Sequence, residues 1–498
     1  MEPYGVGALR ITKYLRYVGL MLIVISTTML APGFYGFLAT WYEGVDEGIY
    51  SLYLLIWGAF TLMLGIFLAS FKDYGELKPY ESLLITVLVW LTIPVYESIP
   101  FTIIVKIPFI DSLFEVTSGW TTTGLTVLTG QPSSWDGTFV PSVEMLPKTI
   151  LLWRSMIQWV GGLGIVVFTI AFLAQPGVSV AQLYLAEGKY EKLEPSFKRT
   201  AYKMGLIYVA ITIIAIIAFI EAGMPLFDSV NHAMTGVATA GFSVKNNSIG
   251  EYHSFNIEIA AMISMILGAV SFSDLRNAFS MRFKEVLKSI ELRTQVFLWA
   301  SSIALGIFIY RSLDLSGFNR EILFQVISAS TTCGFQTMNI GSAPSGFVFL
   351  LTILMLLGGS AFSTAGGIKI YRIVIAAKVT ANEVKNVFAP IGRIDLIKVA
   401  GKIVNDSMVR RSLAVIFSYI MTWMISSVFL SLYYPNLDFS SSAFEVASAL
   451  ANTGLSAGIS SAAAPVPAKI ILILDMLLGR LEVMSYLVLI YLVIEKMR

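Results

Sequence analysis

The stretch Asp111 to Leu128, DSLFEVTSGWTTTGLTVL, recurs in altered form three more times along the 498-residue chain. The other copies are Asp228 to Val244 (DSVNHAMTGVATAGFSV), Glu321 to Met338 (EILFQVISASTTCGFQTM) and Ser441 to Gly458 (SSAFEVASALANTGLSAG). Aligned without gaps, they place four glycines in one column: Gly124, Gly241, Gly334 and Gly454. Self-similarity at a spacing of roughly a hundred residues indicates a chain built from repeated units.

Apolar runs surround each copy. The chain is 56% hydrophobic and only 13% charged, whereas charged residues make up about a quarter of an ordinary soluble domain. About 20 apolar residues cross a bilayer as a helix, and ten such runs are predicted near residues 17–40, 50–70, 80–99, 150–174, 203–222, 257–275, 296–310, 347–375, 412–433 and 469–494. The runs do not alternate apolar with polar residues as barrel strands do. We therefore predict an all-α membrane protein in which each glycine stretch lies between two spans.

The length of each stretch limits what it can do in a membrane. About twelve residues can enter the bilayer as a helix but cannot cross it. The chain must return as an extended loop, and free carbonyls at that depth are tolerated only where they line a cavity. Such carbonyls can replace the water shell of a cation, and glycine lets the backbone approach it closely. A single copy would more often be a packing motif between membrane helices, but four copies in register favour a pore.

With these stretches, the chain resembles the membrane subunit of the Trk/Ktr/HKT potassium-uptake superfamily, and it is most similar to the TrkH branch. The similarity extends to LPKTILLWRSMIQWVGGLG at 146–164, GGSAFSTAGGIKIYR at 358–372 and LLGRLEV at 477–483. The resemblance implies four M1–pore loop–M2 repeats with pseudo-fourfold symmetry around one pore, preceded by two N-terminal transmembrane helices. The expected boundaries are 1–74 for the N-terminal hairpin and 75–176, 177–290, 291–390 and 391–498 for the four repeats.

The resemblance also assigns a selectivity filter. Each loop would contribute one filter glycine, and potassium would bind only to backbone carbonyls. The predicted ion-binding residues are Thr122, Thr123, Gly124, Thr239, Ala240, Gly241, Thr332, Cys333, Gly334, Asn452, Thr453 and Gly454. In this family, glycine in the first repeat goes with potassium and serine with sodium, and all four positions are glycine here.

Two further features point to a barrier below the filter. The run Gly358 to Gly367 has poor helix propensity, so a helix break is expected there, with close helix packing through small residues as the alternative. Arg480 lies within the last apolar run, where an unpaired cation is costly. It forms either an ion pair with Asp475, Glu482 or a carboxylate on another span, or an electrostatic barrier in the ion path. The resemblance favours a gate made of Gly358, Gly359, Gly366, Gly367 and Arg480.

Polar residues also occupy the column nine positions before each glycine: Glu115, His232, Gln325 and Glu445. We expect the two carboxylates to favour helix N-termini, with attraction of cations at the pore mouth as the alternative. His232 is expected to be a satisfied polar contact rather than a metal ligand, and Arg154 a packing and hydrogen-bonding group. One cysteine and two histidines argue against a disulfide scaffold and a zinc site.

Together these features predict potassium transport through a gated, channel-like pore with a glycine-lined filter. An ion-coupled potassium symporter, driven by H⁺ or Na⁺, remains an alternative because broken helices and repeats also mark secondary transporters, as does a sodium-permeable cation transporter. No enzyme motif or nucleotide-binding loop occurs, so we expect no catalytic residue and no cofactor, only K⁺ as the transported ion. The resemblance implies a homodimer and a cytoplasmic, TrkA-like nucleotide-binding partner. The net charge of +2 gives no reason to expect nucleic acid.

The distribution of basic residues predicts the orientation in the membrane. Most of the 34 Lys and Arg residues fall in alternate loops, and the side that carries them faces the cytoplasm in multi-spanning proteins. Counted this way, both termini lie inside, and the first loop, with its acidic residues Glu43, Asp46 and Glu47, lies outside. We expect a multi-pass protein of the cytoplasmic membrane.

Overall fold

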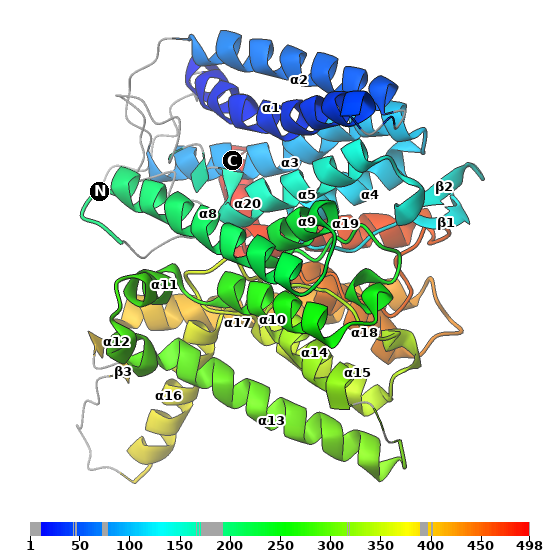
Figure 1. The fold of residues 1–498 in the computed structure, drawn as a ribbon. Coiled ribbons are helices and arrows are strands. Elements are labelled where there is room, and N and C mark those ends of the chain that lie inside the picture. Colours follow the sequence, from blue (N-terminus) through cyan, green and yellow to red (C-terminus); the bar gives the residue numbers. More distant parts are fainter. Residues whose placement is uncertain are drawn as a thin grey trace.

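The computed structural model describes residues 11–42, 44, 47–71, 78–165, 167, 168, 170, 193–315, 317, 319–388, 397–399 and 402–497. The described chain is mostly helical (Figure 1). Its strands form two antiparallel hairpins, β1 (Thr129–Pro132) with β2 (Phe139–Ser142) and β3 (Lys398–Val399) with β4 (Lys402–Ile403).

Six described helices are long and apolar enough to cross a membrane. They are α1 (Ile11–Tyr42), α2 (Gly48–Ala69), α3 (Pro79–Val105), α8 (Phe197–Glu221), α13 (Ile290–Ser312) and α17 (Asp406–Ser431). Their uniform apolarity leaves many large side chains exposed to the surroundings, as expected for helices in contact with lipid. The prediction of an all-helical, multi-spanning protein therefore agrees with the described structure.

The other four predicted spans are not single straight helices. The run 150–174 begins as α5 (Lys148–Leu163), and much of its remainder lies outside the described residues. The run 257–275 is α10 (Phe255–Ala269) followed by α11 (Phe272–Phe279), which meet at 109°. The run 347–375 is broken into α15 (Ser345–Leu357) and α16 (Ile370–Asn386). The run 469–494 is broken into α19 (Val466–Arg480) and α20 (Val483–Met497). The expectation that these four runs are continuous helices thus needs correction, because apolar content alone does not report a break in the backbone.

The first two helices form a tight hairpin along one side of the molecule (Figure 1). Small residues make this possible. A Cβ on Gly19 of α1 would lie 2.7 Å from the carbonyl oxygen of Gly65 on α2, closer than real Cβ atoms come. Close approach of backbones through glycine is a common way to pair helices in a bilayer, where lipid offers no hydrophobic driving force.

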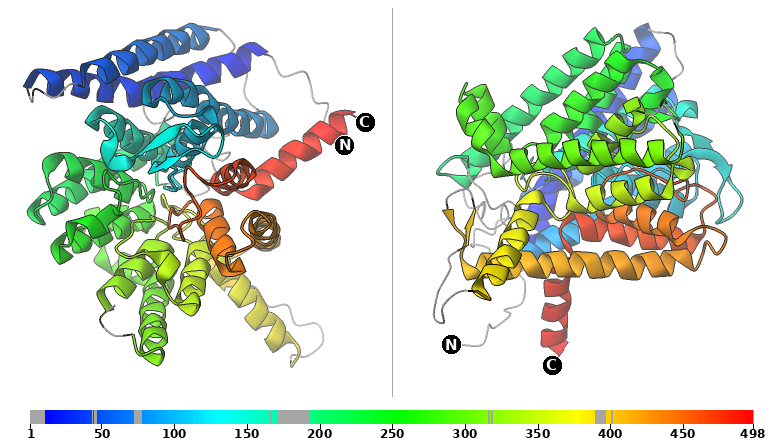
Figure 2. Two further views of the ribbon diagram at one scale, coloured as in Figure 1. Left: turned by 90° about the vertical axis from the view of Figure 1, so that its right-hand side faces the viewer. Right: turned by 90° about the horizontal axis from the view of Figure 1, so that it is seen from below.

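Four short helices of 12 residues each follow long helices: α4 (Phe109–Trp120), α9 (Leu226–Val237), α14 (Asn319–Ser330) and α18 (Phe439–Leu450). Each is followed by a loop and then by one of α5, α10, α15 and α19. These second helices pack on the next short helix, α5 on α9, α10 on α14, α15 on α18, and α19 back on α4. The left view of Figure 2 shows the cyan, green, yellow-green and orange segments following one another around the molecule.

The remaining described elements are the six-residue helix α12 (Phe283–Lys288) and three short 3₁₀ segments, η1 (Val143–Met145), η2 (Ser248–Tyr252) and η3 (Ile340–Ser342). The core between the helices includes the fully buried Trp90, Trp120 and Trp153. Trp120 ends α4, so this core lies directly against the start of the loop that follows that helix.

Candidate functional site

The four loops after the short helices share one backbone conformation. We call them the first to fourth glycine loops, after Gly124, Gly241, Gly334 and Gly454. The residue two before each glycine is left-handed, with φ of 57° at Thr122, 51° at Thr239, 53° at Thr332 and 51° at Asn452. The glycines themselves have φ of 88°, 76°, 91° and 96° at Gly124, Gly241, Gly334 and Gly454. Residues with a Cβ rarely adopt positive φ, so the glycine column of the sequence corresponds to a real backbone requirement.

The ends of the four short helices are also the same. In each, the backbone N–H of the residue before the glycine donates to a carbonyl five residues earlier: Thr123 to Ser118, Ala240 to Thr235, Cys333 to Ser328 and Thr453 to Ser448, at 2.9–3.1 Å. The preceding N–H donates three residues back in every case. These bonds satisfy the end of each helix and turn the chain into the loop.

The loops meet one another in a closed order. A Cβ built on Gly124 would overlap the carbonyl oxygen of Ala240, and one on Gly241 would overlap that of Cys333. A Cβ on Gly334 would in turn overlap the carbonyl oxygen of Thr453, and one on Gly454 that of Thr123. Each glycine thus leaves room for a backbone carbonyl of the neighbouring loop. The structure brings together all twelve residues predicted for the filter.

The polar column before the glycines holds the returning part of each loop. Glu115 accepts from the Thr126 hydroxyl at 2.9 Å and the Val127 N–H at 3.1 Å, and Glu445 accepts from the Ser456 hydroxyl at 2.8 Å. The other two residues of the column also contact the loop that follows their helix. His232 Nε2 lies 2.9 Å from the Ser243 hydroxyl, and Gln325 Nε2 lies 3.3 Å from the Thr337 hydroxyl. The expected N-terminal role of Glu115 and Glu445 is therefore wrong, because their side chains point along the helix to the loop that follows it. His232 is a satisfied polar contact, as predicted.

Arg154 and Gln158 on α5 connect the short helix α4 and α5 itself to the second glycine loop. Arg154 forms a buried ion pair with Glu115, with Nη2 2.6 Å from Oε1, and its guanidinium lies 4.1 Å from the centre of the Phe242 ring. Gln158 donates to the Ala240 carbonyl at 2.9 Å and accepts from the Phe242 N–H at 3.0 Å. Arg154 is thus the packing and hydrogen-bonding group that was expected, and its partners lie in the short helix α4 and in the loop after α9.

The left-handed residues at the base of the four loops have different partners. The Thr122 hydroxyl accepts from Arg480 Nη1 at 3.0 Å, and the Thr239 hydroxyl lies 3.2 Å from that of Thr364. Thr332 accepts from the Gly366 N–H at 2.6 Å. Asn452 instead donates to the Thr123 hydroxyl and the Met476 carbonyl, both at 2.9 Å. The loops repeat one another, but the chain beneath them does not.

Arg480 ends α19 under the first loop. Besides Thr122, it donates to the carbonyl of Gly161, and its guanidinium lies 5.1 Å from the centre of the Trp90 ring. The two carboxylates proposed as its ion-pair partners have described contacts elsewhere: Glu482 pairs with Arg372 at 2.6 Å, and Asp475 accepts from the Ser426 hydroxyl at 2.8 Å.

The expected break between α15 and α16 is confirmed, because α15 ends at Leu357 and α16 begins at Ile370. We call residues 358–369 the crossing loop. Its Thr364 donates to the carbonyls of Val237 and Gly268 at 3.0 and 2.9 Å, so the loop reaches under the second glycine loop. Gly366 lies against the carbonyl of Ala451, where a Cβ would overlap it. The crossing loop therefore contacts the bases of three of the four loops.

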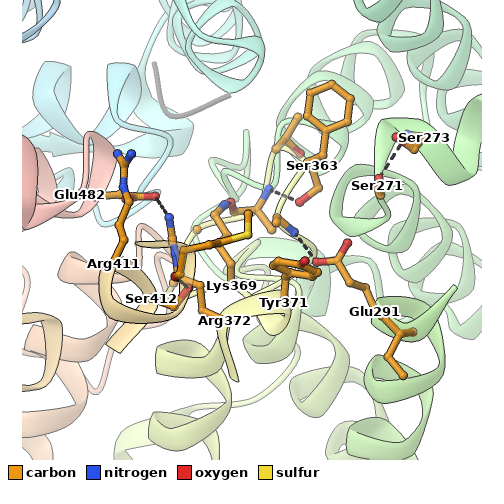
Figure 3. Close-up of a pocket in the computed structure, with 18 of the residues that line it drawn as sticks. Ser271, Ser273, Glu291, Ser363, Lys369, Tyr371, Arg372, Arg411, Ser412 and Glu482 are labelled. Atoms are coloured by element: carbon orange, nitrogen blue, oxygen red, sulfur yellow. Dashed lines mark hydrogen bonds and ion pairs between the residues drawn. The ribbon is translucent and has the colours of Figure 1, made fainter. Parts of the chain in front are cut away.

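A cavity of about 580 Å³ lies beside the crossing loop (Figure 3). It extends from Asn452 and Arg480, at the base of the glycine loops, to the start of α13 and α17. Figure 3 shows Arg372 with Glu482 on one side and Glu291 on the other. Its charged lining residues are of both signs: Asp274, Glu291, Lys369, Arg372, Arg411, Arg480 and Glu482. Within the described residues, no cluster of His, Cys, Asp and Glu is suited to holding a metal ion.

The sequence that forms this site matches a known protein family. A family model described as TrkH, a cation transport protein, matches residues 80–309 and 295–497. The chain belongs to the TrkH family. A TrkH-family potassium uptake protein of Halomonas elongata is 31% identical over 508 residues, covering 95% of this chain and 97% of the relative. An uncharacterised cation transporter of Methanocaldococcus jannaschii is 32% identical over 446 residues, or 88% of each chain.

The TrkH fold is also supported by a solved structure. The crystal structure of the potassium transporter TrkH from Vibrio parahaemolyticus matches with a TM-score of 0.80 and 29% identity, over 97% of this chain and 98% of that one. The resemblance stated from the glycine stretches is therefore correct, and the chain is a multi-pass membrane protein of a transporter family.

Some residues that organise this TrkH-family site were missed in the sequence. Thr364 was not singled out within the small-residue run, and Glu97 of α3, which accepts from Trp120 Nε1 at 2.8 Å, was not noticed. Lys469, which pairs with Asp111, was also missed. A lone charged residue inside an apolar run is a usable signal of this kind, and it could have pointed to Glu97 and Lys469.

Proposed function

We propose that the chain conducts potassium across the cytoplasmic membrane through one pore lined by the four glycine loops. The observation that carries this proposal is the closed order of the loops, in which each glycine accommodates a carbonyl of its neighbour. Curated relatives at 31% identity are named Trk system potassium uptake proteins, which supports potassium as the ion. The proposed filter is Thr122 to Gly124, Thr239 to Gly241, Thr332 to Gly334 and Asn452 to Gly454.

In the proposed mechanism, backbone carbonyls take the place of the water that a potassium ion loses on entering the filter. The four short helices aim their C-terminal ends at these loops, and the partial negative charge there favours a cation over an anion. The buried Arg154–Glu115 pair and Gln158 hold the loops in position. This matters because the carbonyl oxygens around the ion can only substitute for water if they stay in place. This chain's residues supply the lining and its support, and no bond is made or broken.

The crossing loop and Arg480 act as the gate in this proposal. The crossing loop is irregular backbone at membrane depth, which is tolerable where it borders a cavity, and it lies beneath three of the glycine loops. Arg480 places a positive charge next to Thr122, which raises the energy of a cation arriving from the filter. Gly358, Gly359, Gly366 and Gly367 would allow the loop to move away.

The proposed architecture has four repeats, 75–176, 177–290, 291–390 and 391–498, arranged with pseudo-fourfold symmetry after an N-terminal hairpin at 1–74. The recurrence of a 12-residue helix and an identical loop supports this division. We further propose that both termini are cytoplasmic, that two copies pair, and that a nucleotide-binding subunit regulates them on the basic side. These last points rest on charge distribution and family resemblance.

The decisive experiment is ion flux in liposomes containing the purified chain. Uptake of potassium, rubidium, sodium and lithium should be compared, each with and without an imposed proton or sodium gradient. We expect passive potassium and rubidium flux that exceeds sodium flux and does not require a second gradient. Flux that saturates and strictly follows an imposed proton or sodium gradient would instead identify a coupled carrier.

The gate is tested by Arg480→Ala in the same vesicles. Removing the positive charge below the filter should increase potassium flux, while the elution profile of the purified protein should remain that of the native chain. Arg311→Ala, at the far end of α13, is a control that changes charge away from the loops. A correctly folded Arg480→Ala protein with unchanged or reduced flux would show that Arg480 is a structural group and no barrier.

A further inference from the structure

The segment between α10 and α13 lies across the ends of two membrane helices. α10 turns by 109° into α11, and α12 and the start of α13 follow directly. Figure 1 shows α11 and α12 together at one end of the molecule, beside the beginning of α13. A helix that leaves a membrane span at nearly a right angle runs along the bilayer surface. We call residues 272–288 the surface segment.

The surface segment has an inner and an outer face of different character. Phe272 and Leu275 are buried against the core. Apolar side chains nevertheless remain exposed, with Met281 at 76% and Leu287 at 66%, together with Phe279 and Phe283. This exposed set continues along the chain into the apolar outer face of α13, which includes Phe297. Exposed apolar side chains next to a membrane helix are typical of a segment that dips into the interfacial layer of the bilayer.

The exposed charge on the surface segment is mostly basic, with Glu285 as the exposed carboxylate. Arg282, Lys284 and Lys288 lie among the exposed apolar residues. Of the two carboxylates in the segment, Asp274 is buried and accepts from the Ser289 hydroxyl at 2.8 Å, and Glu285 is 3.2 Å from Lys288. Basic residues mixed with aromatic and aliphatic side chains are complementary to an anionic lipid surface.

The surface segment is attached to the crossing loop on its inner side. The N–H of Phe272 donates to the carbonyl of Phe362 at 2.7 Å, and the two rings are 5.8 Å apart. Next to the segment, Glu291 at the start of α13 accepts from the N–H of Ala361 at 2.8 Å. Ser360 donates to the carbonyl of Ala269, at the bend itself, at 3.2 Å. A displacement of the surface segment would therefore be transmitted to residues 360–362.

We propose that the surface segment binds the anionic lipid surface of the bilayer, and that this binding draws the crossing loop away from the glycine loops and increases ion flux. The proposal rests on the proposed function of the crossing loop as a gate. Lipid attraction acts on Arg282 and Lys284 from outside, and the Phe272–Phe362 and Glu291–Ala361 contacts carry it inward.

The test uses the full chain carrying Phe283→Cys, labelled with an environment-sensitive nitrobenzoxadiazole dye. Cys333 is fully buried, so an unmutated chain treated in the same way gives the background labelling. The protein is reconstituted in phosphatidylcholine vesicles with and without phosphatidylglycerol. With phosphatidylglycerol, we expect dye emission at shorter wavelength and a severalfold higher potassium flux from the unlabelled chain.

Arg282→Gln/Lys284→Gln should lose most of both responses. The matched control, Lys378→Gln/Lys385→Gln, removes two charges from α16, one half-buried and one exposed, and should keep both responses. Emission that does not differ between the two lipids would overturn the proposal, and so would a dye response without a flux response. An environment change seen only after adding a soluble protein partner would assign the surface to that partner and also overturn it. If no vesicle conducts potassium, the proposed function fails, and the dye still reports whether the segment binds anionic lipid.

Discussion

At the filter, glycine is required at position 124 for two separate reasons. Its φ of 88° is unfavourable for residues with a Cβ, and a Cβ would overlap the Ala240 carbonyl oxygen. Gly124→Ser should therefore displace a carbonyl of the neighbouring loop and distort the ring. We expect a potassium-to-sodium flux ratio lower by about tenfold, which needs a change of only about 1.4 kcal/mol. Gly137→Ser, in an open turn with nothing within 4 Å of the added Cβ, should leave the ratio unchanged. Equal selectivity of both variants would argue against this filter.

Glu115 is expected to matter for stability as well as for filter shape. It is buried with Arg154, so Glu115→Ala would leave a buried guanidinium without its charge partner. Such a loss destabilises a protein by about 3–5 kcal/mol. The half-exposed pair of Glu144 and Lys245, 3.4 Å apart, should contribute less than about 1 kcal/mol. The temperature at which detergent-purified protein aggregates should therefore fall clearly in Glu115→Ala and little in Glu144→Ala. Similar behaviour of the two would mean that water reaches Arg154.

At the scale of the elements, the crossing loop depends on its own glycines. Gly358 ends α15 with φ of 71°, and a Cβ there would overlap the carbonyl of Gly366 across the loop. Gly358→Ala should push the two ends of the crossing loop apart and loosen the contacts of this loop with Thr239 and Thr332. We expect raised potassium flux with retained preference for potassium, measured in liposomes. In the control Gly346→Ala, the nearest atom to the new Cβ is 3.7 Å away, so flux should not change. Flux that also stays unchanged in Gly358→Ala would remove the loop from the gate.

The elements differ in how far the sequence could predict them. Long apolar runs predict spans because the bilayer imposes a length, and the small-residue run predicted the break after Leu357. The bend between α10 and α11 was not predicted, because an apolar run reads the same whether straight or bent. The glycine column was found by repetition, but the direction of Glu115 and Glu445 was not, since their partners lie 11 or more residues further on, in a loop whose path is set by packing.

At the scale of the whole molecule, the first and last glycine loops must be neighbours for the order to close. Lys469 on α19 and Asp111 on α4 are fully buried and 2.5 Å apart, although 358 residues separate them in the chain. Asp111 also accepts from the Ser133 hydroxyl at 2.5 Å, and Lys469 donates to the Ala462 carbonyl at 2.7 Å. No local sequence pattern predicts which residue lies opposite another at that separation. The pair therefore joins the fourth proposed repeat to the first, which closes the ring of short helices.

This junction gives a prediction for the whole molecule. Lys469→Met leaves Asp111 buried without its cation and should destabilise the protein by about 3–5 kcal/mol, whereas replacing a buried pair by apolar residues is often neutral. The double variant Lys469→Met/Asp111→Leu should therefore recover most of the lost thermal stability, and a double-mutant cycle would measure the coupling. Because α19 also carries Met476, whose carbonyl holds Asn452, the single variant should lower potassium selectivity together with stability. A double variant as unstable as Lys469→Met alone would show that hydrogen bonds to Ser133 and Ala462, rather than the charge pair, hold the first and last loops together.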